Sequence, residues 1–308
     1  MAKALRLKYS VNTIDGQQLL PAGTELTAEV LEKLASSLPR NPGEDLSLLD
    51  HGSVRRDFDT LMIRSPYDQI FSNPEDVEVT CKTMASIRLP PLLLKSMDYF
   101  RENDRYTYFH TIMVFALTCV LAHQMGEDVR DALPEASAGP LHDIGKASLP
   151  LHVMQTSVPL HRSMRDLLEH HAVAGYVLLT YYLGEVESYS AVTARDHHER
   201  RDSSGYPMGI PLSDRYVEIV SVCDVYDALL SPRPYRIEGY DNRTALEEIT
   251  QLAEEGKVGW EIVTHLVALN RKDRPSPEDC AVSREKRGVP PEANSYGIVI
   301  EDEPTQES

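Results

Sequence analysis

Cysteine is scarce and unclustered in this chain of 308 residues. The four cysteines, Cys81, Cys119, Cys223 and Cys280, form no Cys-x-x-Cys pair. This spacing argues against a thiolate zinc site and against a disulfide framework. We therefore expect the protein to work in a reducing cytoplasm.

A hydrophobic leader and long apolar runs are also missing. The first residues, MAKALRLKYS, lack the apolar core of a signal peptide. The longest nearly apolar run, residues 111–122, is too short to cross a bilayer and predicts a buried helix. We therefore expect no association with a membrane.

Positive charge is in deficit, because the formal net charge is −17. This balance argues against nucleic acid or an anionic membrane surface as the partner. A small anionic substrate is still allowed, because charges are screened over roughly 8 Å at physiological salt. A local cluster of cations would therefore set the field in a pocket.

The apolar content is ordinary, with 42% hydrophobic residues, enough for one large domain or two smaller ones. Residues 1–90 contain a turn at Asp15-Gly16, a short strand and an amphipathic helix that Thr27 can cap. They predict a small mixed α/β accessory module without a catalytic constellation. Within it, residues 39–53 are rich in turn-forming residues and predict a linker.

Residues 91–272 predict an all-α domain. Apolar residues recur there at i, i+3 and i+4 in one segment after another, and glycine and proline mark the joints. The remaining residues, 273–308, are polar and proline-rich, and they predict a partly disordered tail.

Histidines and aspartates recur in or beside the apolar helices of the all-α domain. Buried polar groups without partners are costly, and coordination of a metal would explain several of them together. Imidazole and carboxylate suit iron, manganese, nickel or zinc. The candidate ligands are His110, His142, Asp143, His171, His197, His198 and Asp224.

His142 and Asp143 are neighbours, and neighbouring residues of a helix diverge by about 100°. Both can reach one target only if it is broad, such as two ions about 3.5–4 Å apart. Asp143 would then bridge the ions and His142 would bind one of them. Of the pair His170 and His171, we favour His171, because Gly175 leaves room one turn later.

The order of the motifs HDIGK, HHE, GYP, DVYDAL and RPYR resembles the HD-GYP family, bacterial phosphodiesterases of cyclic di-GMP within the HD superfamily. The resemblance runs from about residue 105 to 269. It implies the helical fold of the HD superfamily and the same seven residues as ligands of two metal ions. Some members bind a third ion through a glutamate four residues before the first histidine. Tyr106 stands there in this chain, so we expect two ions.

The resemblance also implies the reaction. A metal-bridging hydroxide would hydrolyse cyclic di-GMP to linear pGpG, with GMP as a further product left open. Asp143 and Lys146 would be catalytic, and Glu199 and Asp227 would hydrogen-bond the ligands and orient them. The expected substrate contacts are Lys146, Arg233, Arg236, Gly205 and Tyr206.

Two rival functions remain open. The first is a metal-bearing, slow or inactive receptor of cyclic dinucleotides, whose GYP loop engages GGDEF-type proteins. Ser203, at a position where the family usually has glycine, leaves room for it. The second is an HD-type phosphohydrolase acting on cyclic GMP-AMP or other nucleotides. The native metal and the oligomeric state, a dimer included, are also open.

Overall fold

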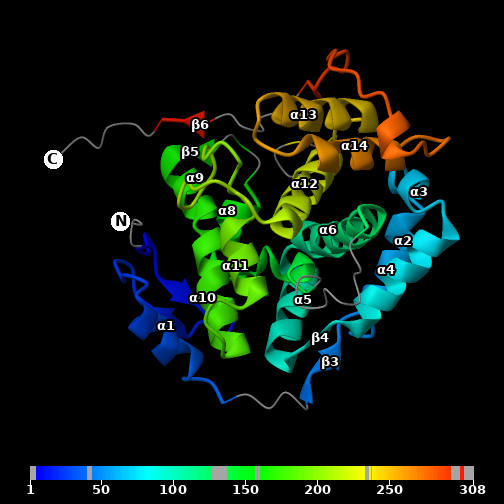
Figure 1. The fold of residues 1–308 in the computed structure, drawn as a ribbon. Helices are drawn as coiled ribbons and strands as arrows, with labels where there is room; N and C mark the ends of the chain where they lie inside the picture. The colour runs from blue at the N-terminus through cyan, green and yellow to red at the C-terminus, as the bar shows by residue number, and fades with distance from the viewer. Residues whose placement is uncertain are drawn as a thin grey trace.

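The computed structural model describes residues 5–39, 44–126, 137–156, 158, 160–232, 236, 238–292 and 299–301. Helices carry most of this part of the chain, as Figure 1 shows. The α-helices are α1 (Ala28–Ala35), α2 (Val54–Met62), α3 (Tyr67–Ile70), α4 (Pro74–Ser86), α5 (Pro91–Asn103), α6 (Arg105–Gln124), α8 (Leu151–Met154), α9 (Arg162–Glu169), α10 (His171–Leu183), α11 (Tyr189–Asp196), α12 (Arg215–Leu230), α13 (Asn242–Glu254) and α14 (Trp260–Leu269).

Short 3-10 helices and strands complete the secondary structure. The 3-10 helices are η2 (Gly139–Leu141), η3 (Ile144–Ser148) and η4 (Pro277–Asp279). The strands form the antiparallel pairs β1 (Val11–Asn12) with β2 (Gln18–Leu20) and β3 (Leu46–Ser47) with β4 (Arg88–Leu89), and the parallel pair β5 (Leu160–His161) with β6 (Val299–Ile300). The predicted fold class, an all-α domain with a mixed α/β N-terminal part, is confirmed.

Helices α6, α10 and α12 lie at the centre of the fold. Their sequences are apolar on all sides rather than on one stripe, which is the pattern of a buried helix. Every residue of α10 from His171 to Tyr182 is buried, as are most residues of α6 and α12. Helix α12 packs against α6, and α10 packs against α11 and η3. The candidate ligands are carried by this group of elements.

The turn expected at Asp15-Gly16 is present and connects β1 with β2. Thr27 caps α1, as expected, by accepting a hydrogen bond from the Val30 N–H. The linker expected from residue 39 to 53 is wrong where the structure describes it. Leu48 and Leu49 are each 1% exposed there, and β3 pairs with β4. Burial of these leucines overrides the turn-forming composition around them.

A single apolar cluster runs through the described chain, from Leu7 near the N-terminus to Cys280. Upstream side chains such as Phe58 and Tyr67 belong to the same cluster as Phe115 of α6. The predicted boundaries at residues 90 and 272 therefore do not coincide with separate cores. The division into three units stays a prediction, because a shared core neither requires nor excludes such a division.

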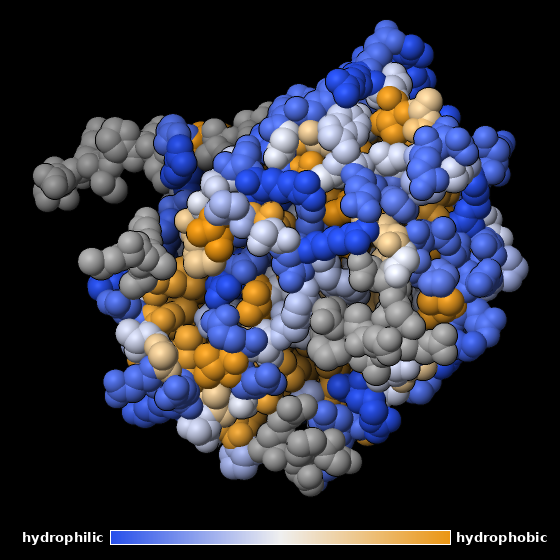
Figure 2. All heavy atoms as spheres, viewed as in Figure 1, coloured by the Kyte–Doolittle hydropathy of each residue, from blue (hydrophilic) through white to orange (hydrophobic). Residues whose placement is uncertain are grey.

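Helix α6 is long and apolar enough to cross a membrane by length and composition. However, 83% of its apolar window is buried inside the protein, which is the setting of a core helix. The face seen in Figure 2 is mainly hydrophilic, with smaller hydrophobic patches between the polar residues. The buried helix expected from residues 111–122 is confirmed.

Candidate metal centre

Five imidazoles and two carboxylates converge in the interior, between α6, α10 and α12. His110 comes from the first turns of α6, and Asp224 from the middle of α12. His171 opens α10, while His197 and His198 directly follow α11. His142 and Asp143 lie between η2 and η3. Six of these side chains are buried, and His198 is partly buried.

The His142–Asp143 pair does not lie within one helix, although the sequence analysis expected it to. The two residues were treated as neighbours in a helix, but they join two 3-10 helices, so α-helical divergence does not apply to them. Pro140 stands in the first turn of η2, where a proline needs no hydrogen-bond donor.

Glycine lets this connection lie directly on α10. A Cβ atom on Gly145 would come within 1.9 Å of the His171 carbonyl oxygen and 2.5 Å of the Gly175 nitrogen. Both are backbone atoms and have little freedom to move. The HDIGK segment therefore needs glycine at this point to bring Asp143 beside His171, which begins α10.

The outward-facing nitrogens of three histidines contact backbone carbonyl oxygens. The Nδ1 atom of His142 lies 2.7 Å from the Gly139 carbonyl oxygen, and that of His171 lies 2.6 Å from the Leu168 carbonyl oxygen. His197 Nδ1 lies 3.0 Å from the Ala194 carbonyl oxygen. A carbonyl accepts only from N–H, so these rings carry the proton on Nδ1 and direct the Nε2 lone pair inward.

The inward-facing Nε2 atoms lie close together. His171 Nε2 is 3.4 Å from His197 Nε2 and 3.1 Å from His198 Nε2. The Nε2 atom of His142 is buried without a hydrogen-bond partner in the described part of the chain. The Nε2 lone pairs of His171 and His197 face each other, which is costly unless a donor or a cation lies between them.

The Asp143 carboxylate lies between two groups of ligands. Its Oδ1 is 3.3 Å from His171 Nε2, whereas its Oδ2 is 3.4 Å from His142 Nε2 and 3.5 Å from His110 Nε2. On the other side, Asp224 Oδ1 is 3.1 Å from His110 Nε2. Three overlapping sets of residues have ligand atoms within 4.8 Å of one another: His171, His197 and His198; His110, His142 and Asp224; and His142, Asp143 and His197.

The protonation states suit metal ligation. Burial lowers the pKa of His171 to about 4, and burial with the nearby His142 and His171 lowers that of His197 to about 3. Burial also holds the pKa of His198 well below its usual value. Burial alone would raise the pKa of Asp143, but Lys146 and the neighbouring His142 keep it well below its usual range. The ring and carboxylate groups are thus ready as neutral and anionic ligands.

His110 differs from the other histidines because two carboxylates flank it. Its Nδ1 lies 2.6 Å from Asp227 Oδ2, and its Nε2 faces Asp224. Burial lowers the pKa of His110, but the contacts with Asp224 and Asp227 outweigh burial and raise it to about 9. A cation beside Nε2 would take the place of the proton there, as metal binding to a protonated ligand requires.

Asp227, which contacts His110, is itself held by a residue that the sequence did not reveal. The Tyr67 hydroxyl donates to Asp227 Oδ1 at 2.5 Å. Burial, with the charge of Asp227 beside it, raises the pKa of the Tyr67 phenol well above its usual value, so it stays a donor. No motif could have indicated Tyr67, because its partner lies 160 residues away in the sequence.

The second residue expected to orient a ligand, Glu199, has a different task. Its carboxylate is fully buried and accepts from the backbone N–H groups of Met208, Gly209 and Ile210. These bonds anchor the GYP loop, residues 202–210, rather than a histidine ring. The expected role of Glu199 at a ligand is therefore corrected to a role in fixing this loop.

The GYP loop lies against the histidine cluster. The Tyr206 ring stacks on the His198 ring, with centroids 4.5 Å apart and planes 23° apart. A Cβ atom on Gly205 would come within 2.3 Å of the His198 carbonyl oxygen, so only glycine fits. Ser203 has φ of 65°, in the left-handed region that glycine occupies without strain.

The expected cationic substrate contacts have different positions. Lys146 Nζ lies 2.5 Å from Asp143 Oδ2, at the edge of the ligand cluster. Arg236 is 1% exposed, and its Nη2 donates to the carbonyl oxygens of Ala228, Leu229 and Ser231. The expected contact of Arg236 with substrate is therefore corrected, because its guanidinium closes the C-terminal end of α12. Arg233 lies outside the described residues.

Tyr106, at the position where a third-metal ligand was considered, stacks on the His110 ring with centroids 5.4 Å apart. A phenol is a poorer ligand than a carboxylate for hard divalent ions. The chemistry of the clustered donors, with their inward lone pairs and ionised carboxylates, fits divalent metal ions. The chain therefore carries histidine and aspartate clusters that can bind metal, with Tyr106 beside them as a packing residue.

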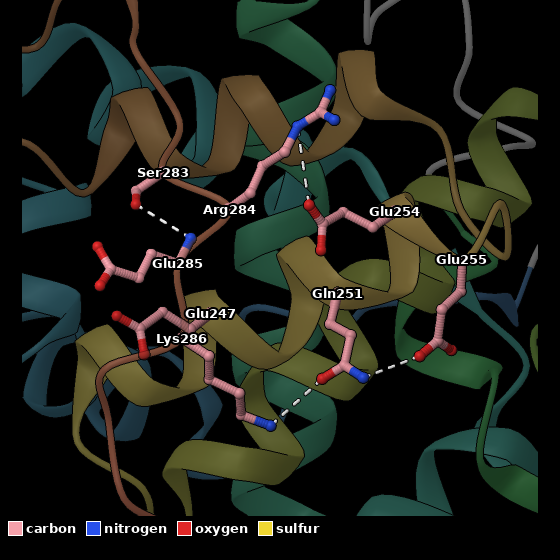
Figure 3. Close-up of a pocket in the computed structure, with 8 residues that line it drawn as sticks. All are labelled: Glu247, Gln251, Glu254, Glu255, Ser283, Arg284, Glu285 and Lys286. Atoms are coloured by element: carbon pink, nitrogen blue, oxygen red, sulfur yellow. Dashed lines mark hydrogen bonds and ion pairs between the residues drawn. The ribbon is translucent and has the colours of Figure 1, made fainter.

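A cleft of about 380 Å³ lies elsewhere, between α13 and residues 283–286. Figure 3 shows its lining side chains paired with one another, such as Arg284 with Glu254 and Lys286 with Gln251. None of the residues that line it belongs to the ligand cluster. We therefore assign the candidate functional site to the converging ligands and not to this surface cleft.

Comparisons with known proteins bear on the same segment. Residues 81–262 match the HD domain family. A cyclic di-GMP phosphodiesterase of Pseudomonas aeruginosa is 34% identical over 176 residues, covering 55% of this chain and 40% of that protein. A cyclic di-GMP phosphodiesterase response regulator of Xanthomonas campestris is 38% identical over 122 residues, covering 38% and 32% respectively.

A relative with another printed substrate matches as well. A 3'3'-cGAMP-specific phosphodiesterase of Vibrio cholerae is 31% identical over 136 residues, covering 44% of this chain and 31% of that protein. The chain thus spans less than half the length of these curated relatives. Since the family match covers more than half of its residues, the chain belongs to the HD domain family, and its predicted resemblance to the HD-GYP branch is confirmed.

Proposed function

We propose that the protein hydrolyses the phosphodiester bonds of cyclic di-GMP with the help of two divalent metal ions. The observation that carries the proposal is the position of Asp143, whose two oxygens face different groups of histidines. A carboxylate between two ligand groups is the arrangement that a pair of ions needs. When bound, the ions would lower the pKa of a water molecule and polarise the phosphoryl oxygens.

The residues of this chain would share the remaining work. The proposed ligands are His110, His142, Asp143, His171, His197, His198 and Asp224, all of which belong to the clustered donor sets. Lys146, beside Asp143, would neutralise charge on the phosphoryl group. Tyr206 and Gly205 would form the wall of the substrate site, because the GYP loop lies against His198. Asp227 would hold the His110 ring in the orientation that the ion requires.

The choice of metal rests on the donor atoms, and the choice of compartment rests on the cysteines. Nitrogen and oxygen ligands suit iron or manganese, which we propose first, with nickel or zinc as alternatives. The product would be linear pGpG, with further cleavage to GMP left to the assay. All four cysteines are free thiols, which supports a location in the reducing cytoplasm.

A turnover assay tests the proposed function. Protein loaded with Mn²⁺ or Fe²⁺ is incubated with cyclic di-GMP, and the products are separated by liquid chromatography. We expect pGpG from the wild type, and for Asp143→Ala a rate lower by at least about a hundredfold, more than the loss of an outer hydrogen-bond partner costs. A fully metal-loaded wild type without any hydrolysis would contradict the proposal.

The same assay separates the alternatives. The similarity to a 3'3'-cGAMP-specific phosphodiesterase favours a parallel measurement with cyclic GMP-AMP. A faster rate on that substrate would replace cyclic di-GMP in the proposal. The strained Ser203 and the 40% exposed Ile210 in the GYP loop favour a test of the receptor function. Tight cyclic di-GMP binding without turnover, with capture of a GGDEF-type protein lost in Ile210→Ser, would support it.

A further inference from the structure

Tyr67 lies outside the segment that matches the HD domain family, residues 81–262, yet its hydroxyl donates to Asp227, which contacts the candidate ligand His110. It opens α3, in the part of the chain where the sequence showed no catalytic constellation. The Tyr67 ring is packed in the apolar cluster and is 8% exposed. A buried hydroxyl that donates to a carboxylate near a metal centre calls for an explanation beyond packing.

The contacts form a chain of two hydrogen bonds with Asp227 at its middle. Tyr67 donates to Asp227 Oδ1, while His110 Nδ1 contacts Asp227 Oδ2 at 2.6 Å. Each oxygen is therefore held from a different side, which fixes the plane of the carboxylate. The His110 ring is fixed in turn, with its Nε2 aimed at Asp143 and Asp224.

The α3 helix is held in place by the other end of the chain. Gln69 Nε2 donates to the Arg271 carbonyl oxygen at 3.1 Å, and Arg274 donates to the Ile70 carbonyl oxygen at 3.3 Å. These bonds fasten α3 to the segment that follows α14. The Tyr67 hydroxyl is thus presented by a helix that has its own anchors and does not depend on the metal ligands for its position.

We propose that Tyr67 is a positioning residue for metal binding, acting through Asp227 on His110. The upstream part of the chain thereby sets the affinity of the ion held by His110, His142 and Asp224. In the other group, the Nδ1 atoms of His171 and His197 are fixed instead by the carbonyl oxygens of Leu168 in α9 and Ala194 in α11. Loss of the Tyr67 hydroxyl would therefore weaken one ion much more than the other. This inference rests on the two-metal centre of the proposed function.

Calorimetric titration of metal-stripped protein with Mn²⁺ tests the inference without any substrate. For Tyr67→Phe, which keeps the ring in the core, we expect one of the two binding events to weaken by about tenfold or more. The second event should keep its affinity. Tyr176→Phe is the matched control, because it removes a buried hydroxyl that donates to the Glu187 carboxylate, away from the ligands. Both of its binding events should equal those of the wild type.

A double-mutant cycle shows whether Tyr67 acts through Asp227. In the Asp227→Ala background, Tyr67→Phe should change neither binding event further, because the side chain through which it acts is gone. An unchanged titration of Tyr67→Phe, or an equal weakening of both events that persists in Asp227→Ala, would overturn the inference. A wild type that binds two ions but hydrolyses no cyclic dinucleotide would overturn the proposed function alone.

Discussion

The side of each histidine ring that carries the proton decides what the cluster can bind. His142, His171 and His197 each direct Nδ1 at a backbone carbonyl, so Nε2 is left as the ligand atom. His110 uses Asp227 for the same purpose. The motif order in the sequence identified these residues, but it could not tell which nitrogen faces inward. That choice depends on carbonyls positioned by the ends of η2, α9 and α11.

Strain at one loop residue gives a prediction at the same scale. Ser203 has a left-handed backbone, so Ser203→Gly should raise the free energy of unfolding by up to about 1 kcal/mol. Urea unfolding measures the change. Ser204→Gly is the control, because it removes the hydroxyl that donates to Asp202 at 2.7 Å, and it should lower the stability. A stability loss in Ser203→Gly equal to that of Ser204→Gly would contradict the assigned strain.

The close crossing of η3 over α10 is the contact between elements that the metal centre depends on. Gly145 touches the backbone at His171 and Gly175, so the segment that bears Asp143 lies directly on the helix that begins with His171. From the sequence we expected Gly175, one turn after His171, to leave room near that ring. It could not show that the closer approach is made by Gly145.

Gly145→Ala should therefore disturb the crossing. The added Cβ would meet backbone atoms at 1.9 and 2.5 Å, and such overpacking costs about 1–3 kcal/mol or more. We expect a lower melting temperature together with fewer bound ions per chain, measured by thermal unfolding and elemental analysis. Gly175→Ala is a milder control, because its nearest contact is the Ala194 Cβ at 3.1 Å. Equal melting temperatures and metal contents in both variants would refute the role given to Gly145.

Helices were more predictable from the sequence than their connections. Recurring apolar residues indicated α6, α10, α12 and α13, because a helix that packs in the core needs apolar side chains on every turn. The HDIGK segment was treated as helical, but glycine and proline favour the two 3-10 turns that the structure has. The turn-forming residues around Leu48 and Leu49 likewise concealed that these two leucines are buried beside a short strand pair.

At the scale of the whole molecule, one apolar core joins the upstream part to the HD domain segment. This joining is what the sequence could not reveal, because Tyr67 and Asp227 meet only after folding. The chain has a net charge of −17, and the face seen in Figure 2 is mainly hydrophilic. Two divalent ions in the interior would give the site a local charge opposite to that of the protein, which suits an anionic substrate.

Anomalous diffraction from a crystal grown with Mn²⁺ would test the two-ion centre most directly. We predict two anomalous peaks, one on each side of the Asp143 carboxylate, with His171 near one ion and His110 near the other. Their separation should be about 3.5–4 Å. A single peak, or two peaks away from the histidine cluster, would contradict the arrangement on which the proposed hydrolysis and the role of Tyr67 both rest.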